Sequence, residues 1–169
     1  MKSLLYAVAA LTLFSCGRRN DTKIEHNDNR PDVAYVSKYS VKDSMILDKN
    51  LGKVVERTYS GVIPAADGPG IRYDLTLWNQ EKSGTGVYAL STTYLEADNG
   101  KDKTFDSTGK WYTLRGDATD KNATVFQLVP SNKNDDKMNF LVQGRDSLTM
   151  LNASLERANS KLNYTLTRR

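Results

Sequence analysis

Apolar and polar residues alternate along most of the chain from residue 57 onward. In the clearest run, residues 71–78, apolar side chains such as Ile71, Tyr73 and Leu75 occupy every second position. A period of two places successive side chains on opposite faces of a strand, so such a run is typical of a strand with one buried face. The pattern predicts seven or eight strands, at residues 58–63, 71–78, 86–95, 110–115, 124–129, 138–143, 147–151 and 162–167.

Turn-forming residues separate these segments, at Asn99-Gly100, Thr108-Gly109, Gly116-Asp117, Pro130-Ser131-Asn132 and Gln143-Gly144. Short strands joined by short turns predict an all-β domain in which the strands form an antiparallel meander. Closing the meander into a barrel pairs both edge strands, which a flat sheet leaves open. We therefore expect a small antiparallel β-barrel, with a two-sheet sandwich as the competing architecture. Residues 153–161 fit either a short helix or a hairpin turn.

The beginning of the chain has the pattern of an export signal. Lys2 precedes an apolar run from Leu4 to Phe14. As a helix this run would span roughly 17 Å, against about 30 Å of bilayer hydrocarbon, so it is too short for a permanent membrane span. We interpret residues 1–15 as a signal peptide.

The residues after this run resemble the lipobox of bacterial lipoproteins. Ser15-Cys16-Gly17 contains Cys16, the only cysteine of the chain. The resemblance implies cleavage after Ser15 and acylation of the Cys16 thiol, because a thiolate forms the thioether readily. Since Gly17 stands where an Asp would retain a lipoprotein at the inner membrane, the outer membrane is favoured, with the periplasmic or surface face left open. The competing interpretation is an ordinary signal peptide with an incidental Cys.

We expect residues 16–56 to comprise the lipidated Cys16 and a flexible tether. Between residues 17 and 31, Ile24 is the one large aliphatic side chain, so this stretch cannot build a core. Residues 44–53 show no clear period and fit a short helical turn. Alternating residues just before them fit an edge strand: Val33, Tyr35, Ser37, Tyr39 and Val41.

The composition argues against several classes of site. The 169 residues include 24 basic and 20 acidic ones, for a net charge of +4. The basic residues are spread evenly and form no stripe with aromatic residues, so we expect no nucleic-acid partner. One Cys and one His, His26 in the tether, leave no ligand set for a zinc or iron–sulfur centre. No nucleophile with a catalytic partner is visible, so we expect no enzyme activity, no cofactor and no metal site.

Three further patterns were candidates for binding. Gly84 and Gly86 form a lone Gly-x-Gly that lacks the following helix of a phosphate loop. The pair Asp135-Asp136 lacks the oxygen-ligand spacing of a calcium loop and fits a solvated turn. A barrel of this size has an interior that side chains just fill, or that holds one small ligand. Aromatic residues at strand positions fit a packed core, with a ligand pocket as the alternative: Trp78, Trp111, Tyr88, Tyr94, Phe126 and Phe140.

The loop before the clearest strand carries a family resemblance. Residues 59–71 read Tyr-Ser-Gly-Val-Ile-Pro-Ala-Ala-Asp-Gly-Pro-Gly-Ile, residues 105–111 read Phe-Asp-Ser-Thr-Gly-Lys-Trp, and residues 162–166 read Leu-Asn-Tyr-Thr-Leu. The order and spacing of these motifs resemble the N-terminal domain of the NlpE family, outer-membrane lipoproteins linked to copper resistance and envelope-stress signalling. The resemblance implies a lipocalin-like antiparallel barrel over residues 57–169. We expect the second, C-terminal domain of that family to be absent here, because the sequence ends at Arg169 just after the last predicted strand.

The sequence departs from that family at its Cys-x-x-Cys, which falls on Ala65 and Gly68 here. A soft Cu(I) site needs thiolate or thioether donors, so we do not carry over metal binding. The rest of the loop matches. We therefore expect a structural role for Pro64, Ala65, Asp67, Gly68 and Gly70, with Asp67 capping the turn.

Together these patterns and the resemblance predict a lipid-anchored envelope lipoprotein of the NlpE type. We expect it to act as a non-enzymatic binding or sensing module, related to envelope stress or copper homeostasis as the resemblance implies. We expect attachment to the membrane through acylated Cys16 and contact with an envelope protein partner. The alternatives are a lipocalin-like carrier of a small apolar ligand and a surface structural or adhesion subunit. Small side chains at the inward positions would favour the carrier, and a filled interior would favour the interaction module.

Overall fold

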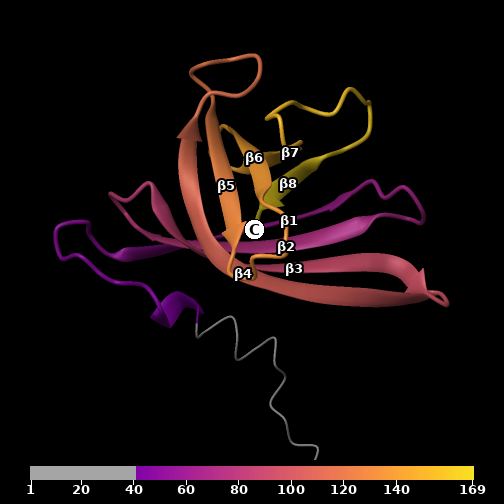
Figure 1. The fold of residues 1–169 in the computed structure, drawn as a ribbon, viewed down its shortest axis with the longest axis horizontal. Helices are drawn as coiled ribbons and strands as arrows, with labels where there is room; N and C mark the ends of the chain where they lie inside the picture. Colours follow the sequence, from indigo (N-terminus) through magenta and orange to yellow (C-terminus); the bar gives the residue numbers. More distant parts are fainter. Residues whose placement is uncertain (1–40) are drawn as a thin grey trace, which may run out of the picture. The chain divides into compact units, whose positions relative to one another are not determined.

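The computed structural model describes residues 41–169, which form a closed antiparallel barrel (Figure 1). Its strands are β1 (Val54–Ile63), β2 (Ile71–Gln80), β3 (Thr85–Asp98), β4 (Lys101–Arg115), β5 (Thr124–Pro130), β6 (Met138–Gln143), β7 (Ser147–Leu151) and β8 (Thr165–Arg168). Each strand pairs with the next, and β8 closes the ring on β1 by pairing Arg168 with Tyr59 and Thr167 with Ser60. The predicted all-β barrel is confirmed, and its closure excludes the sandwich.

Strand β4 is where the structure departs most from the predicted strands. It begins at Lys101 rather than at residue 110, and it passes straight through the predicted turn at Thr108-Gly109. Residues 101–107 pair with β3 alone, whereas the half from Gly109 onward pairs with β3 and β5. In Figure 1, β4 accordingly bends as it leaves the long β3–β4 hairpin and joins the barrel wall. Residues 153–161 contain no helix and form turns and bends before β8.

The barrel interior is filled by large side chains. Strand pairing places alternate residues on one face; for example Leu75 of β2 lies opposite Tyr59 of β1 and Leu90 of β3. Fully burying each such aliphatic side chain contributes roughly 1.5–3 kcal/mol to folding. Inward side chains with relative exposures below 2% are Leu75, Leu77, Tyr88, Trp111, Leu128, Phe140, Leu148 and Leu166.

Two glycines on the inward face lie where neighbouring atoms approach closely: backbone of Val129 and Pro130 at Gly109, and backbone together with an aromatic ring at Gly86. Gly86 of β3 pairs with Trp111 of β4, and Gly109 of β4 pairs with Tyr88 of β3. The Trp111 indole N–H donates to the Trp78 carbonyl at 3.1 Å, directly beside Gly86. A glycine inside a strand often marks such a close approach of backbone or side chain. Of the two glycines in the Gly84-x-Gly86 pattern, Gly86 therefore serves ring packing.

Arg57 occupies one end of the interior. Its guanidinium lies 5.3 Å from the ring centroids of both Trp111 and Phe126. Its Nη2 donates to Asn79 Oδ1 at 2.8 Å, and Asn79 is itself buried on β2. Cation–π contacts and a charge-assisted hydrogen bond together stabilise a guanidinium at a partly buried site. This end of the barrel is consequently occupied by the protein's own side chains.

Residues 44–53, here called the strap, are held against the outer face of the barrel. The Gln80 amide accepts a hydrogen bond from Asp48 N at 2.8 Å and donates to the carbonyls of Asp48 and Gly52, both at 2.7 Å. Gln80 is only 5% exposed although it lies outside the barrel, because the strap covers it. The strap contains turns, and the helical turn at residues 41–43 precedes it, so Val41 is helical rather than part of an edge strand.

We expect Gln80→Ala to release the strap. The change removes three hydrogen bonds at once, so the free energy of unfolding should fall by about 1–3 kcal/mol. Amide hydrogen exchange at Asp48 should also accelerate by at least tenfold. Gln127→Ala is the matched control, because Gln127 makes one side-chain hydrogen bond, to Asn139, away from the strap. Unchanged Asp48 exchange in Gln80→Ala would show that the strap is held by other contacts.

Several predictions concern residues outside the described part of the chain. These are the signal peptide at residues 1–15, the lipidation of Cys16, the tether with His26, and Val33, Tyr35, Ser37 and Tyr39 of the possible edge strand. Within residues 41–169, no helix has both the length and the apolar character needed to cross a bilayer.

Candidate functional site

The barrel opens at the end opposite Arg57 into a hollow of about 720 Å³, here called the mouth. Its aromatic lining comes from inward positions of β2, β3 and β4: Tyr73, Tyr88, Tyr94 and Phe105. Met138 of β6 lines it as well. Small-molecule sites are concave, measure roughly 300–1,000 Å³ and are mostly apolar with a few polar groups. The mouth has both the size and the lining of such a site.

The four aromatic side chains differ in depth. Tyr73 and Tyr88 are 5% and 1% exposed and lie deep in the mouth, whereas Tyr94 and Phe105 are 39% and 51% exposed on the extended β3–β4 hairpin. Tyr94 and Phe105 meet edge to face, with their ring centroids 5.8 Å apart. Such pairs are favourable because the positive edge of one ring contacts the negative face of the other. The mouth therefore has a buried aromatic base and an exposed aromatic rim.

The phenols at the base stay neutral over the physiological range. Burial raises the pKa of Tyr73, and the neighbouring Tyr94 raises it further. Burial also raises the pKa of Tyr88; its hydrogen bond with Ser107 (3.1 Å between the two oxygens) lowers it, and the negative charge of Asp135 raises it. Neutral phenols offer a polar O–H without adding charge. The charge of the mouth is consequently set by its rim.

Charged residues at the rim are mainly acidic. The pair Asp135-Asp136 lines the mouth, against one ammonium group, that of Lys103. Asp135 and Asp136 lie in the loop between β5 and β6, where the Asn132 side-chain amide donates to Asp135 Oδ1 at 2.9 Å. The Lys103 ammonium lies 5.3 Å from the ring centroid of Phe105. One face of the aromatic rim thus already holds a cation of the protein itself.

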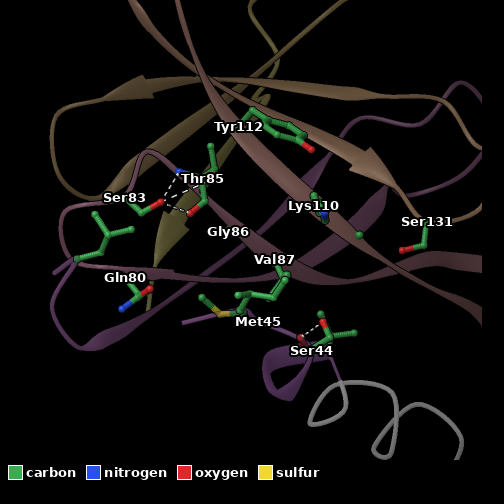
Figure 2. A pocket seen from close by; sticks show the side chains of 14 residues that line it. Ser44, Met45, Gln80, Ser83, Thr85, Gly86, Val87, Lys110, Tyr112 and Ser131 are labelled. Atoms are coloured by element: carbon green, nitrogen blue, oxygen red, sulfur yellow. Dashed lines mark hydrogen bonds between the residues drawn. The ribbon is translucent and has the colours of Figure 1, made fainter. Parts of the chain in front are cut away.

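A second hollow lies on the outer face of the barrel and is shown in Figure 2. It measures about 400 Å³ and lies between the strap and strands β3 and β4, with Met45 placed beside Val87. Tyr112 and Lys110 line its other side. Lys110 is the one charged residue that lines it. This hollow is smaller than the mouth and has fewer charged groups, and it is therefore the weaker candidate.

The loop between β1 and β2 contains the five residues assigned a structural role from the sequence. Gly68 and Gly70 have φ angles of +112° and +146°, which favour glycine. The Gly70 carbonyl accepts a hydrogen bond from Leu95 N at 3.1 Å, so it ties the loop to β3. Pro64 and Ala65 are half-buried, whereas Asp67 is exposed and makes no side-chain hydrogen bond within residues 41–169.

The fold and the loop agree with the comparison with protein families. The profile of the NlpE N-terminal domain matches residues 59–161, from within β1 to the turns before β8, which is more than half of the chain. The chain belongs to the NlpE family. Comparisons with curated proteins and with solved structures gave no match. NlpE is a family of envelope-associated lipoproteins. Membership in it supports the interpretation of this chain as a lipoprotein-type module of the cell envelope.

The copper association of NlpE proteins does not fit residues 41–169. The loop offers Ala65 and Gly68 at the two cysteine positions, so it has no thiolate. Within the described residues, Met45 lies on the outer face, Met138 lines the mouth and Met150 packs against the core. No three His, Cys, Asp or Glu side chains gather within residues 41–169. A Cu(I) site needs several soft donors together, and the described residues place none together.

Sequence reasoning identified part of the mouth. Tyr88 and Tyr94 were candidates, and the structure brings them together with Tyr73 and Phe105. The other aromatic candidates, Trp78, Trp111, Phe126 and Phe140, are buried packing residues. Sequence reasoning missed Lys103 and Phe105, because residues 101–109 were not predicted as strand. It also placed Asp135-Asp136 in a solvated turn without connecting that turn to the mouth.

Proposed function

We propose that this chain is a lipid-anchored envelope binding module that engages its ligand or partner at the mouth of its barrel. One observation carries the proposal: the interior is filled while one end stays open. Side chains such as Leu77, Trp111 and Phe140 are at most 1% exposed, so the centre of the barrel is occupied by the protein's own core. The open end offers about 720 Å³ with an aromatic rim. This arrangement favours binding at an end over transport inside the barrel.

The anchoring part of the proposal rests on the sequence around Cys16 and on family membership. We further propose that the module lies at the outer membrane and takes part in envelope sensing without catalysis. A copper-homeostasis role is not part of the proposal, because the described residues offer no soft donor set. The structural or adhesion alternative gains no specific support from the barrel.

A carrier of a small apolar ligand remains the second candidate, and the volume of the mouth favours it. The hollow lies within the size range of small-molecule sites. A carrier that uses this hollow would hold its ligand at the rim and would leave part of it in solvent. The mass of the bound molecule therefore distinguishes a small-molecule carrier from a module that binds a protein partner.

Photo-crosslinking in the native envelope tests the proposal. A photoreactive benzoylphenylalanine replaces Tyr94 at the rim. The matched control places it at Tyr112 on the outer face of β4, because the exposed fractions of the two side chains are similar, 39% for Tyr94 and 37% for Tyr112. We expect a discrete adduct from position 94 that disappears when Phe105→Ser is added, and no adduct from position 112. An adduct with an added mass of a few hundred daltons would support the carrier function. An adduct with the added mass of a protein would support the interaction module. Adducts from position 112 alone would contradict binding at the mouth.

A further inference from the structure

We infer that the mouth selects small cationic amphiphiles: molecules with an apolar or aromatic body and one positively charged nitrogen. This inference rests on the proposed role of the mouth as a binding site, and it adds the chemical class of the ligand. Three observations carry it. They are the aromatic composition of the rim, the sign of its charges, and the position of Lys103.

The aromatic rings provide both surface and electrostatic attraction. Tyr73 and Tyr88 form a buried base against which an apolar body can pack, and Tyr94 and Phe105 present exposed ring area above them. The faces of aromatic rings carry negative potential and attract cations, ammonium groups included. The same rings give an anion no comparable attraction. Ring composition alone therefore separates cationic from anionic ligands of equal size.

The charges that line the mouth act in the same direction. Asp135 and Asp136 outnumber Lys103, and the Asp135 charge reaches the base of the mouth, where it raises the pKa of Tyr88. The Asp106 carboxylate lies on the opposite face of β4, where it accepts a hydrogen bond from Ser91 at 2.5 Å, so the Asp135-Asp136 pair is the partner available to a ligand. Lys133 and Lys137 flank that pair in the loop but do not line the hollow. A cation in the mouth therefore faces an excess of carboxylates.

Lys103 shows that the rim attracts a cation. Its ammonium lies 5.3 Å from the centre of the Phe105 ring, although the side chain is on an exposed part of β4 and is free to extend into solvent. A cationic ligand would compete with Lys103 for this ring face. The position of the Lys103 ammonium over the Phe105 ring therefore predicts that removing the Lys103 charge strengthens the binding of a cation.

The test uses two probes with the same fluorophore and opposite charge, dansylcadaverine (cationic) and dansylglycine (anionic). The full chain carries ¹³C-methyl labels on its methionines and is bound to phosphatidylcholine nanodiscs. The Met138 methyl signal reports binding at the mouth, and the Met45 signal, from the outer face, is the internal reference. We expect dansylcadaverine to shift Met138 selectively and to bind at least fivefold more tightly than dansylglycine.

Variants at the exposed rim separate the possible outcomes. The double change Asp135→Asn with Asp136→Asn should weaken dansylcadaverine binding about fivefold, and Lys103→Gln should strengthen it about threefold, because charges near the surface interact modestly across a partly solvated gap. Equal binding of both probes, unaffected by these variants, would overturn the cationic preference while leaving the mouth as a binding site. Failure of both probes to shift Met138 would count against both this inference and the proposed function at the mouth.

Discussion

Gly86→Ala should lower the free energy of unfolding by about 3 kcal/mol or more, enough to leave much of the protein unfolded. A Cβ atom at this position would lie 1.8 Å from the Trp78 carbonyl oxygen and 2.8 Å from the Trp111 indole nitrogen. Neither neighbour can simply move aside. One is backbone of the adjacent strand, and the other is a buried ring that donates a hydrogen bond to that same carbonyl. Overpacking of this kind displaces backbone and breaks contacts around it.

The neighbouring glycine provides the control for this prediction. At Gly84 a Cβ would meet only the Thr113 side chain, at 3.5 Å, and φ lies outside the left-handed region. Gly84→Ala should therefore change stability by no more than about 0.5 kcal/mol, and reduced freedom of the unfolded chain offsets part of any loss. Urea unfolding followed by tryptophan fluorescence measures both variants. Equal midpoints for the two would show that the strand pair tolerates a methyl group beneath Trp111.

Cys16→Ala should abolish lipidation completely. The lipobox interpretation places the acyl chains on Cys16, on its thiol and on the amine freed by cleavage, and the chain contains no other cysteine. Since each buried methylene contributes roughly 0.8 kcal/mol to membrane affinity, losing two or three acyl chains removes the stable anchor. Intact-mass measurement should show a chain without added acyl mass that retains residues 1–15, because cleavage after Ser15 depends on the modified cysteine.

The matched variant for this second prediction is Ser15→Ala, which keeps a small residue before Cys16 and should be acylated and cleaved normally. The barrel should fold in both variants, because residues 59–161 carry the family domain. Circular dichroism of the purified chains checks this point. Radioactive palmitate incorporated into Cys16→Ala would refute the lipobox interpretation.

Alternation of apolar and polar residues was sufficient to predict most of the barrel. Strands β2, β6 and β7 begin where the pattern begins, because each has one face in the core and one toward the outside. The first half of β4 escaped prediction because residues 101–107 project from the barrel wall and bury neither face. Charged and polar residues are stable there, so the apolar period is absent. Gly109 was misinterpreted as a turn because a glycine required by a close approach of strand backbone and a glycine in a turn look alike in sequence.

The mouth was harder to predict than the fold because it combines distant parts of the chain. Tyr73 and Tyr88 belong to the same alternating pattern as the core, and nothing local distinguishes a residue at the end of the barrel from one at its centre. The acidic pair Asp135-Asp136 reaches the mouth through the loop between β5 and β6. Which residues share an end of a barrel depends on strand register. Residue spacing alone does not specify that register.

The projecting half of β4 has a consequence for self-association. Residues 101–107 have one strand neighbour within the described part of the chain, so their other edge exposes backbone groups that a strand of a second molecule can use. Exposed edges of this kind promote aggregation unless charge or shape blocks them. Charges of alternating sign lie on this edge near the tip of the hairpin, at Lys101, Asp102 and Lys103. If a second copy paired there in parallel register, each charge would face a charge of the same sign. These charges thus oppose edge-to-edge pairing of two copies and favour a monodisperse protein.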